Sequence, residues 1–81
     1  MSIVDLTVPH WGLEMEEAIV KDWLKNVGDT IEVGEPVVTL ETDKAEAEVD
    51  AEVSGRLVEI VASLGDVVEP GDVLGRIEID V

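Results

Sequence analysis

Cysteine, phenylalanine and tyrosine do not occur in this chain of 81 residues, and His10 is its only histidine. Without cysteine the chain has no disulfide framework, no thiol nucleophile and no cysteine ligands for zinc. A single histidine also excludes a histidine cluster around a metal ion. The absence of cysteine suits a cytoplasmic protein, and the cytoplasm is the location we expect.

Basic residues are scarce. Five lysines and arginines stand against 20 aspartates and glutamates, which gives a formal net charge of −15. Nucleic acids and anionic membranes both require a basic surface on a protein that binds them, so we expect neither as a partner. Basic protein surfaces remain as candidate partners. The alternative is that the acid excess serves solubility, or adaptation to a salty cytoplasm.

Long apolar runs and phosphate-binding loops are missing as well. No apolar run approaches the length of a membrane span, and residues 1–5 lack the basic start of a signal peptide. The glycines punctuate turns and precede no expected helix, so glycine-rich phosphate loops are excluded. With no catalytic constellation left, we expect a domain that catalyses nothing by itself.

The hydrophobic residues of the chain are mostly aliphatic, and many of them are β-branched. The hydrophobic fraction of 46% comes mostly from Val, Ile, Leu and Ala, with two Trp, and this composition favours strands. Between regular turn signals we expect strands at residues 3–8, 18–24, 30–32, 38–41, 45–52, 56–62 and 73–80. Short strands at this spacing predict an all-β sandwich or barrel. The length indicates a single domain, residues 1–81, of a size that buries about 60% of its unfolded surface.

A hairpin is expected around Lys44. Residues 38–41 alternate apolar and polar, and residues 45–52 alternate small or apolar side chains with acids, the period of two half-buried strands. Asp43 and Lys44 then form the tip, and a type I turn fits a pair without glycine. Lys44, the only basic residue between Lys25 and Arg56, therefore stands at an exposed apex. The acids of the second strand lie on its solvent face, where such a row is usually only a wet surface.

The chain repeats itself with a constant shift of 37 positions (65 − 28 = 37). The shift matches turn residues and apolar residues together, for example Gly28 with Gly65, Gly34 with Gly71, Val20 with Leu57, Trp23 with Ile60 and Leu40 with Ile77. Two repeats are too few for a solenoid, so we expect a compact body with pseudo-two-fold symmetry. Its halves are about residues 4–43 and 44–81, which puts the hairpin at one pole and the chain ends at the other.

The segment Glu41-Thr42-Asp43-Lys44-Ala45 carries a family resemblance. With Val27-Gly28-Asp29 before it and Val53-Ser54-Gly55 after it, it resembles the lipoyl domain of the dihydrolipoamide acyltransferases of 2-oxo acid dehydrogenase complexes, over nearly the whole chain from about Val4 to Ile79. The resemblance implies a flattened barrel of two antiparallel sheets related by pseudo-two-fold symmetry. It also implies that Lys44 carries lipoic acid through an amide bond.

The resemblance further implies a swinging-arm carrier and its partners. A lipoate ligase or lipoyl transferase would modify Lys44 and recognise its neighbours Glu41, Thr42, Asp43 and Ala45. A thiamine-dependent 2-oxo acid decarboxylase would reductively acylate the arm, the acyltransferase core would pass the acyl group to coenzyme A, and dihydrolipoamide dehydrogenase would reoxidise the arm. The chemistry belongs to the cofactor, and tethering raises its local concentration. We expect the isolated domain to be a monomer.

The loop of residues 9–16 departs from the family, in which this segment is often glycine-rich and acidic or a Ser-Pro stretch. The family places this loop beside the lipoyl hairpin, so we expect it to take part in partner recognition, as exposed aromatic residues on loops often do. The residues proposed for this role are His10, Trp11, Gly12, Leu13 and Met15. The alternative is that Trp11 packs over the end of the barrel. Trp23, in a strand, is expected to be core or half-buried.

Three alternatives stay open. Biotinyl carrier domains resemble this fold, but methionines typically flank their lysine, whereas Asp43 and Ala45 flank Lys44. A structural barrel-sandwich module, as in membrane-fusion adaptors, needs no apex lysine. The third alternative is an acyltransferase enzyme. The catalytic motif His-x-x-x-Asp-Gly of that family is absent, because the residues after His10 do not match it, so the chain is at most the carrier part of such an enzyme.

The residue after the lysine bears on the type of complex. Ala45 resembles the residue found there in pyruvate, branched-chain and acetoin systems, since the oxoglutarate type tends to have valine at this position.

Overall fold

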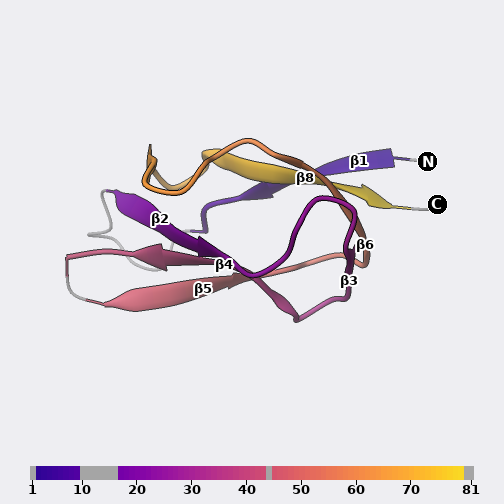
Figure 1. Ribbon diagram of the computed structural model, residues 1–81, viewed down its shortest axis with the longest axis horizontal. Helices are drawn as coiled ribbons and strands as arrows, with labels where there is room; N and C mark the ends of the chain where they lie inside the picture. Colours follow the sequence, from indigo (N-terminus) through magenta and orange to yellow (C-terminus); the bar gives the residue numbers. More distant parts are fainter. Residues whose placement is uncertain (1, 10–16, 44, 80–81) are drawn as a thin grey trace.

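Two four-stranded antiparallel sheets form the protein (Figure 1). The computed structural model describes residues 2–9, 17–43 and 45–79, and all regular structure within them is β. The strands are β1 Ser2–Thr7, β2 Ala18–Trp23, β3 Thr30–Ile31, β4 Pro36–Glu41, β5 Glu46–Asp50, β6 Gly55–Ile60, β7 Val67–Val68 and β8 Val73–Ile79. One sheet has the order β1-β8-β6-β3 and the other β5-β4-β2-β7. The all-β prediction is confirmed. In the part of the chain that the structure describes, no helix is long and apolar enough to cross a membrane.

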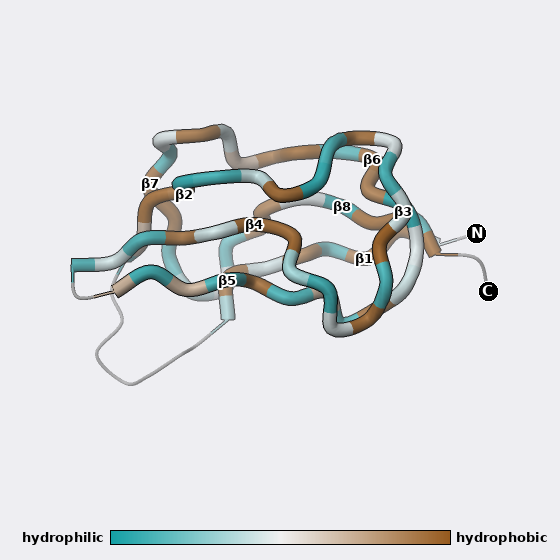
Figure 2. Tube along the Cα trace, turned by 60° about the horizontal axis from the view of Figure 1, so that its bottom comes forward, coloured by the Kyte–Doolittle hydropathy of each residue, from teal (hydrophilic) through white to brown (hydrophobic). Residues whose placement is uncertain are grey.

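The core between the sheets is entirely aliphatic. Buried or half-buried apolar residues alternate with exposed acids along β5, and the colour of the tube in Figure 2 alternates along this strand in the same way. The largest fully buried side chains of the core are Ile31, Leu40, Leu57, Leu74, Ile77, Val8, Val20, Val37 and Val38. Among the described residues, no polar or charged side chain is buried. Trp23 is half-buried against this core and donates its Nε1 hydrogen to the carbonyl oxygen of Ala62 at 2.8 Å, so the expectation for Trp23 is confirmed.

The internal repeat is visible in the hydrogen bonds. Gly28 donates its N–H to the carbonyl oxygen of Leu57 at 2.7 Å, and Gly65 donates its N–H to that of Val20 at 2.8 Å. The donors differ by 37 positions, as do the acceptors. Both glycines have positive φ, 100° and 87°, a conformation that other residues adopt only with strain. Turns of the same shape therefore lead into β3 and β7.

The constant shift does not extend to the first strand of each half. Gly71 donates to the carbonyl oxygen of Val8 at 2.9 Å, and Gly34 donates to that of Ala51 at 2.8 Å. Val8 and Ala51 are thus equivalent, yet they are 43 positions apart (51 − 8 = 43). The prediction of one gapless shift is wrong here, because the connection from β1 to β2 is six residues longer than the connection from β5 to β6 (43 − 37 = 6).

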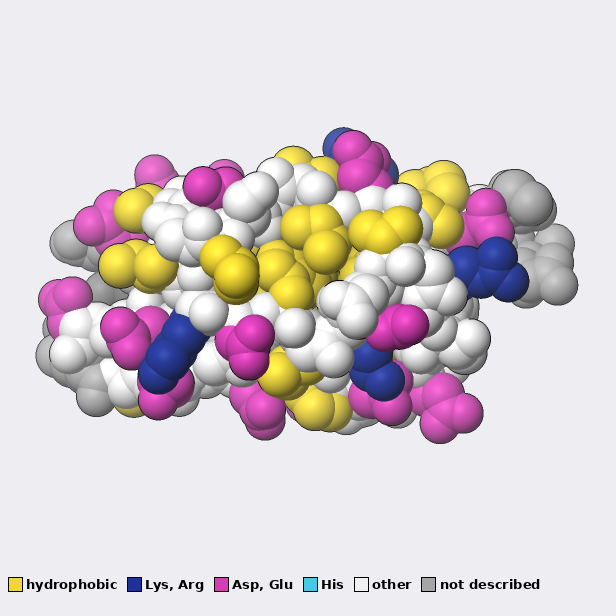
Figure 3. Space-filling model, viewed as in Figure 1, with side chains coloured by type: hydrophobic (Ala, Val, Ile, Leu, Met, Phe, Trp, Pro, Cys, Tyr) yellow, Lys and Arg dark blue, Asp and Glu magenta, His cyan; other side chains and the backbone are white. Residues whose placement is uncertain are grey.

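The molecule is elongated, with extents of 37 × 22 × 17 Å. The turn between β4 and β5 lies at one end, whereas β1 begins and β8 ends at the other (Figure 1). This arrangement confirms the expectation that the hairpin and the chain ends occupy opposite poles. On the face drawn in Figure 3, acidic side chains outnumber the basic ones, and each basic group lies beside an acidic one.

Candidate functional site

The hairpin of β4 and β5 holds the predicted site at the end of the long axis. The two strands pair with Leu40 opposite Ala47 and Glu41 opposite Glu46. β4 lies inside its sheet, between β5 and β2, and its side chains Val38 and Leu40 are fully buried. The base of the hairpin is therefore anchored in the core, while its tip projects into solvent.

Thr42 and Ala45 close the turn. Thr42 donates its N–H to the carbonyl oxygen of Ala45 at 2.8 Å. The Thr42 hydroxyl donates to the same oxygen at 3.0 Å and accepts the Ala45 N–H at 3.3 Å. The side chain thus takes the place that a carbonyl would have in a regular ladder pair. A threonine at this position holds both sides of the turn in register.

Between these two residues lie Asp43 and Lys44. Asp43 is exposed and so is Ala45, which places the neighbours of Lys44 on both sides in solvent at the end of the hairpin. Lys44 itself lies outside the described residues, and so does the turn type, which stays a prediction. The predicted attachment site is therefore described by its neighbours Asp43 and Ala45.

Lys21 ties the base of the hairpin together, a contact that the sequence analysis missed. It lies at an irregularity in the β2–β4 pairing, between Val20 and Asp22. Its Nζ atom hydrogen-bonds to Glu46 Oε2 and lies 3.5 Å from Glu41 Oε2. A residue of β2 therefore reaches across β4 to β5. The hydrogen bond to Glu46 is the main cause that raises the pKa of Lys21; the attraction of both carboxylates adds to it, and desolvation opposes it.

We expect Lys21→Gln to loosen the hairpin in a pH-dependent way. Because the pKa of Lys21 is raised in the folded state, its contribution to stability is present below the ordinary value of 10.5 and is lost as the pH rises through the folded-state pKa. Since the side chain is exposed, the effect is small and screened by salt. Amide hydrogen exchange of Thr42 and Glu46 measures it: at pH 7 exchange is faster in the variant than in the parent.

The matched control is Lys25→Gln. Lys25 forms an ion pair with Glu35 at 3.1 Å, and the hydrogen bond from Lys25 is the main cause that lowers the pKa of Glu35. The control changes the net charge equally but leaves the hairpin contacts in place. Equal exchange at Thr42 in the two variants would show that Lys21 acts through overall charge and not through its contacts.

The remaining predicted site residues fall in the connection from β1 to β2. His10, Trp11, Gly12, Leu13 and Met15 lie outside the described residues, so their role in partner recognition stays a prediction. The described residues on either side are Pro9, which is half-buried, and Glu17, which is exposed. In residues 2–9, 17–43 and 45–79, no group of three or more His, Cys, Asp or Glu side chains is arranged to hold a metal ion.

Comparison with known proteins identifies the family. The Biotin_lipoyl family model, described as "Biotin-requiring enzyme", matches residues 4–77. The match spans nearly the whole chain, so the chain belongs to this family of biotin/lipoyl domains. Within the family its relatives are dihydrolipoyllysine acyltransferase components. The resemblance to lipoyl domains that the sequence indicated is thereby confirmed.

Three curated relatives illustrate the range of enzyme systems in which similar domains occur. The acetyltransferase component of the pyruvate dehydrogenase complex of Corynebacterium glutamicum is 42% identical over 90% of this chain and 11% of that protein. The succinyltransferase component of the 2-oxoglutarate dehydrogenase complex of Bartonella vinsonii is 43% identical over 91% of this chain and 18% of that protein. The acetyltransferase component of the acetoin cleaving system of Cupriavidus necator is 40% identical over 91% and 20%. The chain thus spans at most a fifth of these proteins.

Solved structures give the same fold. The lipoyl domain of the 2-oxoglutarate dehydrogenase complex from Azotobacter vinelandii, a solution structure, superposes with a TM-score of 0.74 at 34% identity, over 94% of this chain and 96% of that one. The urea carboxylase of Kluyveromyces lactis superposes with a TM-score of 0.80 at 28% identity, over 96% of this chain and 6% of that one. The flattened sandwich of two antiparallel sheets is therefore the fold of lipoyl domains.

Proposed function

We propose that this chain is a swinging-arm carrier domain whose Lys44 bears a lipoyl group in amide linkage. The observation that carries the proposal is the exposure of Asp43 and Ala45, on either side of Lys44, at the end of a hairpin in a chain that belongs to the biotin/lipoyl family. A carrier lysine must be accessible first to a modifying enzyme and then to several active sites in turn. A projecting turn anchored in a rigid sheet meets both needs.

The described residues fit such a group. Thr42 and Ala45 fix the turn through three hydrogen bonds, and Lys21 secures its base. The protein then supplies a firm support for Lys44, and a bound dithiolane would supply the chemistry of acyl and electron transfer. None of these residues needs to act as an acid, a base or a nucleophile, which supports a carrier domain without catalytic activity of its own.

Asp43 and Ala45 are the residues we propose for recognition by a lipoate ligase or lipoyl transferase. Both are exposed beside Lys44 and so present surface to another protein. Glu41 and Thr42, which we also propose for this role, have structural contacts with Lys21 and Ala45. Substituting either of these two therefore changes the support of the turn as well as the surface that an enzyme reads.

The proposed partners follow from the systems named for the relatives. They are a thiamine-dependent 2-oxo acid decarboxylase, the acyltransferase core and dihydrolipoamide dehydrogenase. We further propose that residues 1–81 form one carrier domain with halves at about 4–43 and 44–81, monomeric when isolated and located in the cytoplasm. Pyruvate, 2-oxoglutarate and acetoin systems occur among relatives of nearly equal identity, so the oxo acid is left open.

Modification confined to Lys44 is the expected result of incubating the domain with lipoate, ATP and a lipoate ligase. The chain has three lysines, and the other two, Lys21 and Lys25, are held in ion pairs. Peptide mass mapping locates the adduct. Lys44→Arg is expected to abolish the mass increase, whereas Lys25→Arg leaves it unchanged. An adduct on Lys21 or Lys25, or no adduct on the folded parent, would contradict the proposal.

Biotin attachment at Lys44 is the second candidate, favoured by the family description and by the superposition on urea carboxylase. The flanks of Lys44 weigh against it, because they are Asp43 and Ala45 and not methionine. A biotin protein ligase with biotin and ATP, used in the same mass assay, separates the two candidates. The double variant Asp43→Met/Ala45→Met serves as its positive control, since both positions are exposed and substitution there leaves the fold intact.

A further inference from the structure

The edges of the two sheets face an open seam on one side of the sandwich. β1 pairs only with β8, and β5 pairs only with β4, so each ends its sheet. Within the described part of the chain, each of these strands keeps one row of backbone N–H and C=O groups without a partner strand. Such edges are ready to pair with an additional extended segment. β1 and β5 are also equivalent strands of the two halves, since Val8 corresponds to Ala51.

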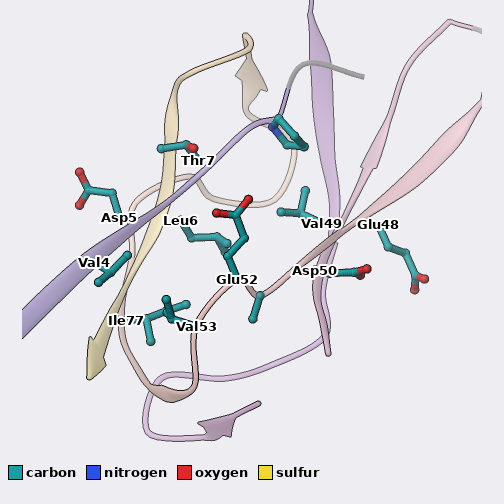
Figure 4. A pocket seen from close by; sticks show the side chains of 12 residues that line it. Val4, Asp5, Leu6, Thr7, Glu48, Val49, Asp50, Glu52, Val53 and Ile77 are labelled. Carbon is teal, nitrogen blue, oxygen red and sulfur yellow. The ribbon is translucent and has the colours of Figure 1, made fainter. Parts of the chain in front are cut away.

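A groove of about 290 Å³ lies between these edges. Its apolar lining comes from both strands and from residues near them: Val4, Leu6, Pro9, Val49, Ala51, Val53 and Ile77. Its polar lining consists of Asp5, Thr7, Glu48, Asp50 and Glu52. In Figure 4 the Glu52 carboxylate reaches over the middle of the groove, while those of Asp5 and Glu48 point outward on opposite sides. The groove thus has an apolar floor and an acidic rim.

The charge of the rim selects among possible occupants. Four carboxylates line the groove, and no lysine or arginine is among the lining residues. Arg76 contacts Asp5 at 3.3 Å, which leaves the β5 side strongly negative. A second copy of this chain carries the same acidic strands and a net charge of −15, so pairing between copies is opposed by repulsion. A cationic segment of another protein has the complementary charge.

We infer that the seam between β1 and β5 is a docking groove for an extended cationic segment of a partner protein, which adds as a strand to one of the two edges. Side chains of an added strand alternate in direction, so small aliphatic residues face the apolar floor and lysine or arginine residues meet the rim. Main-chain hydrogen bonds to the free edge provide the binding, and the rim provides the specificity.

The groove is separate from the proposed attachment site. None of its lining residues belongs to the turn of residues 42–45, so a partner held there leaves the hairpin tip accessible. The inference does not depend on modification of Lys44, because the groove is formed by the unmodified chain. Glu48, Asp50 and Glu52 disfavour pairing of the β5 edge with a neutral or acidic strand and favour pairing with a basic strand.

Binding of a peptide that alternates lysine and valine tests the inference. The probe is an acetylated and amidated heptapeptide with lysine at both ends. The isolated domain is suited to the measurement, because the matching lipoyl domain of 2-oxoglutarate dehydrogenase was solved as a chain of which this one covers 96%. Titration of ¹⁵N-labelled unmodified domain is expected to shift the amide signals of β1 and β5. A peptide of the same charge that is N-methylated at alternate residues is expected to bind at least about tenfold more weakly, because it lacks strand donors.

Two charge-matched variants complete the test. Glu48→Gln/Asp50→Asn/Glu52→Gln removes three rim charges and is expected to weaken binding by about tenfold. Asp22→Asn/Glu32→Gln/Glu69→Gln removes three exposed charges elsewhere and is expected to change binding by less than about twofold. Equal weakening in both variants, equal binding of the methylated peptide, shifts outside β1 and β5, or no binding would overturn the inference. Self-association of the domain through these edges in sedimentation would overturn it in favour of a second copy.

Discussion

Replacing Gly55 with alanine is expected to destabilise the domain by about 3 kcal/mol or more, a large part of the 5–15 kcal/mol that typically stabilises a small domain. A Cβ atom at this position would lie 2.2 Å from the carbonyl oxygen of Glu78 and 2.9 Å from Ile77 Cγ2. The first contact is with the backbone of the neighbouring strand β8, which cannot move without disturbing the sheet. Thermal unfolding is expected to show a melting temperature lower by about 15 °C or more.

The matched control is Gly28→Asn. A Cβ atom at Gly28 meets nothing within 4 Å, although its φ of +100° is unfavourable for other residues. The cost is therefore confined to backbone strain of about 1 kcal/mol. Lipoylation of Lys44 at physiological temperature should fall in the Gly55 variant with its folded fraction and stay near the parent value in the Gly28 variant. Equal melting temperatures for Gly55→Ala and the parent would contradict the close approach of β6 and β8.

The hairpin and the repeat were predictable because both are visible directly in the order of the residues. Alternation in residues 38–41 and 45–52 is a local signal for strands, and residues 43–44 are too few for anything but a turn. The repeat is a direct comparison of the sequence with itself. Strand β7 was not predicted, because it has only two residues. The repeat could have revealed it, since the equivalent strand β3 was expected at residues 30–32.

The contacts beneath the hairpin were not predictable, because they depend on strand order. Lys21 is 25 positions from Glu46, and the two meet only because β2 and β5 flank β4 in one sheet. Ile19 lies opposite Glu41, and Glu41 lies opposite Glu46, so Lys21, two residues after Ile19, lies on the same exposed face as both carboxylates. The periodicity of a strand predicts which of its side chains face the core, but it does not predict which strands lie next to it in the sheet. Val37 is buried beside Val38 for a similar reason, since the pairing of β4 with β5 is irregular between Pro36 and Val38.

The sequence motif correctly includes Gly55 but does not explain why glycine is needed at this position. Ser54 and Gly55 lie between the expected strands 45–52 and 56–62, and the family resemblance includes both residues. In the structure Gly55 is the first residue of β6, opposite Ile31 of β3. Glycine is required there by lack of space, and not by positive φ, which occurs at Gly28, Gly34, Gly65 and Gly71. Only the three-dimensional packing of β6 against β8 distinguishes the two reasons.

The whole sandwich, and not the lysine motif, is expected to make the proposed carrier domain a good substrate for a thiamine-dependent decarboxylase. A lipoylated peptide of residues 41–45 keeps the motif but loses the pairing with β2, the Lys21 contacts and the buried Val38 and Leu40. An isolated two-stranded hairpin is at best marginally stable in water. We therefore expect the cognate decarboxylase to acylate the lipoylated domain on the order of 100-fold faster than the peptide or free lipoamide, because misplacement of a reacting group has costs of this size.

The measurement compares the acylation rates of the domain, the peptide and free lipoamide, with the same decarboxylase and equal concentrations of lipoyl groups. The loop of residues 9–16 offers an internal control: exchanging it for the loop of a non-cognate lipoyl domain is expected to lower the acylation rate. Lipoylation of Lys44 should stay unchanged, since all residues proposed for ligase recognition lie within residues 41–45. Gly28→Asn, which keeps the fold, should retain the parent rate. Equal rates for domain, peptide and free lipoamide would mean that the decarboxylase reads only the cofactor, and that the sandwich serves merely to tether it.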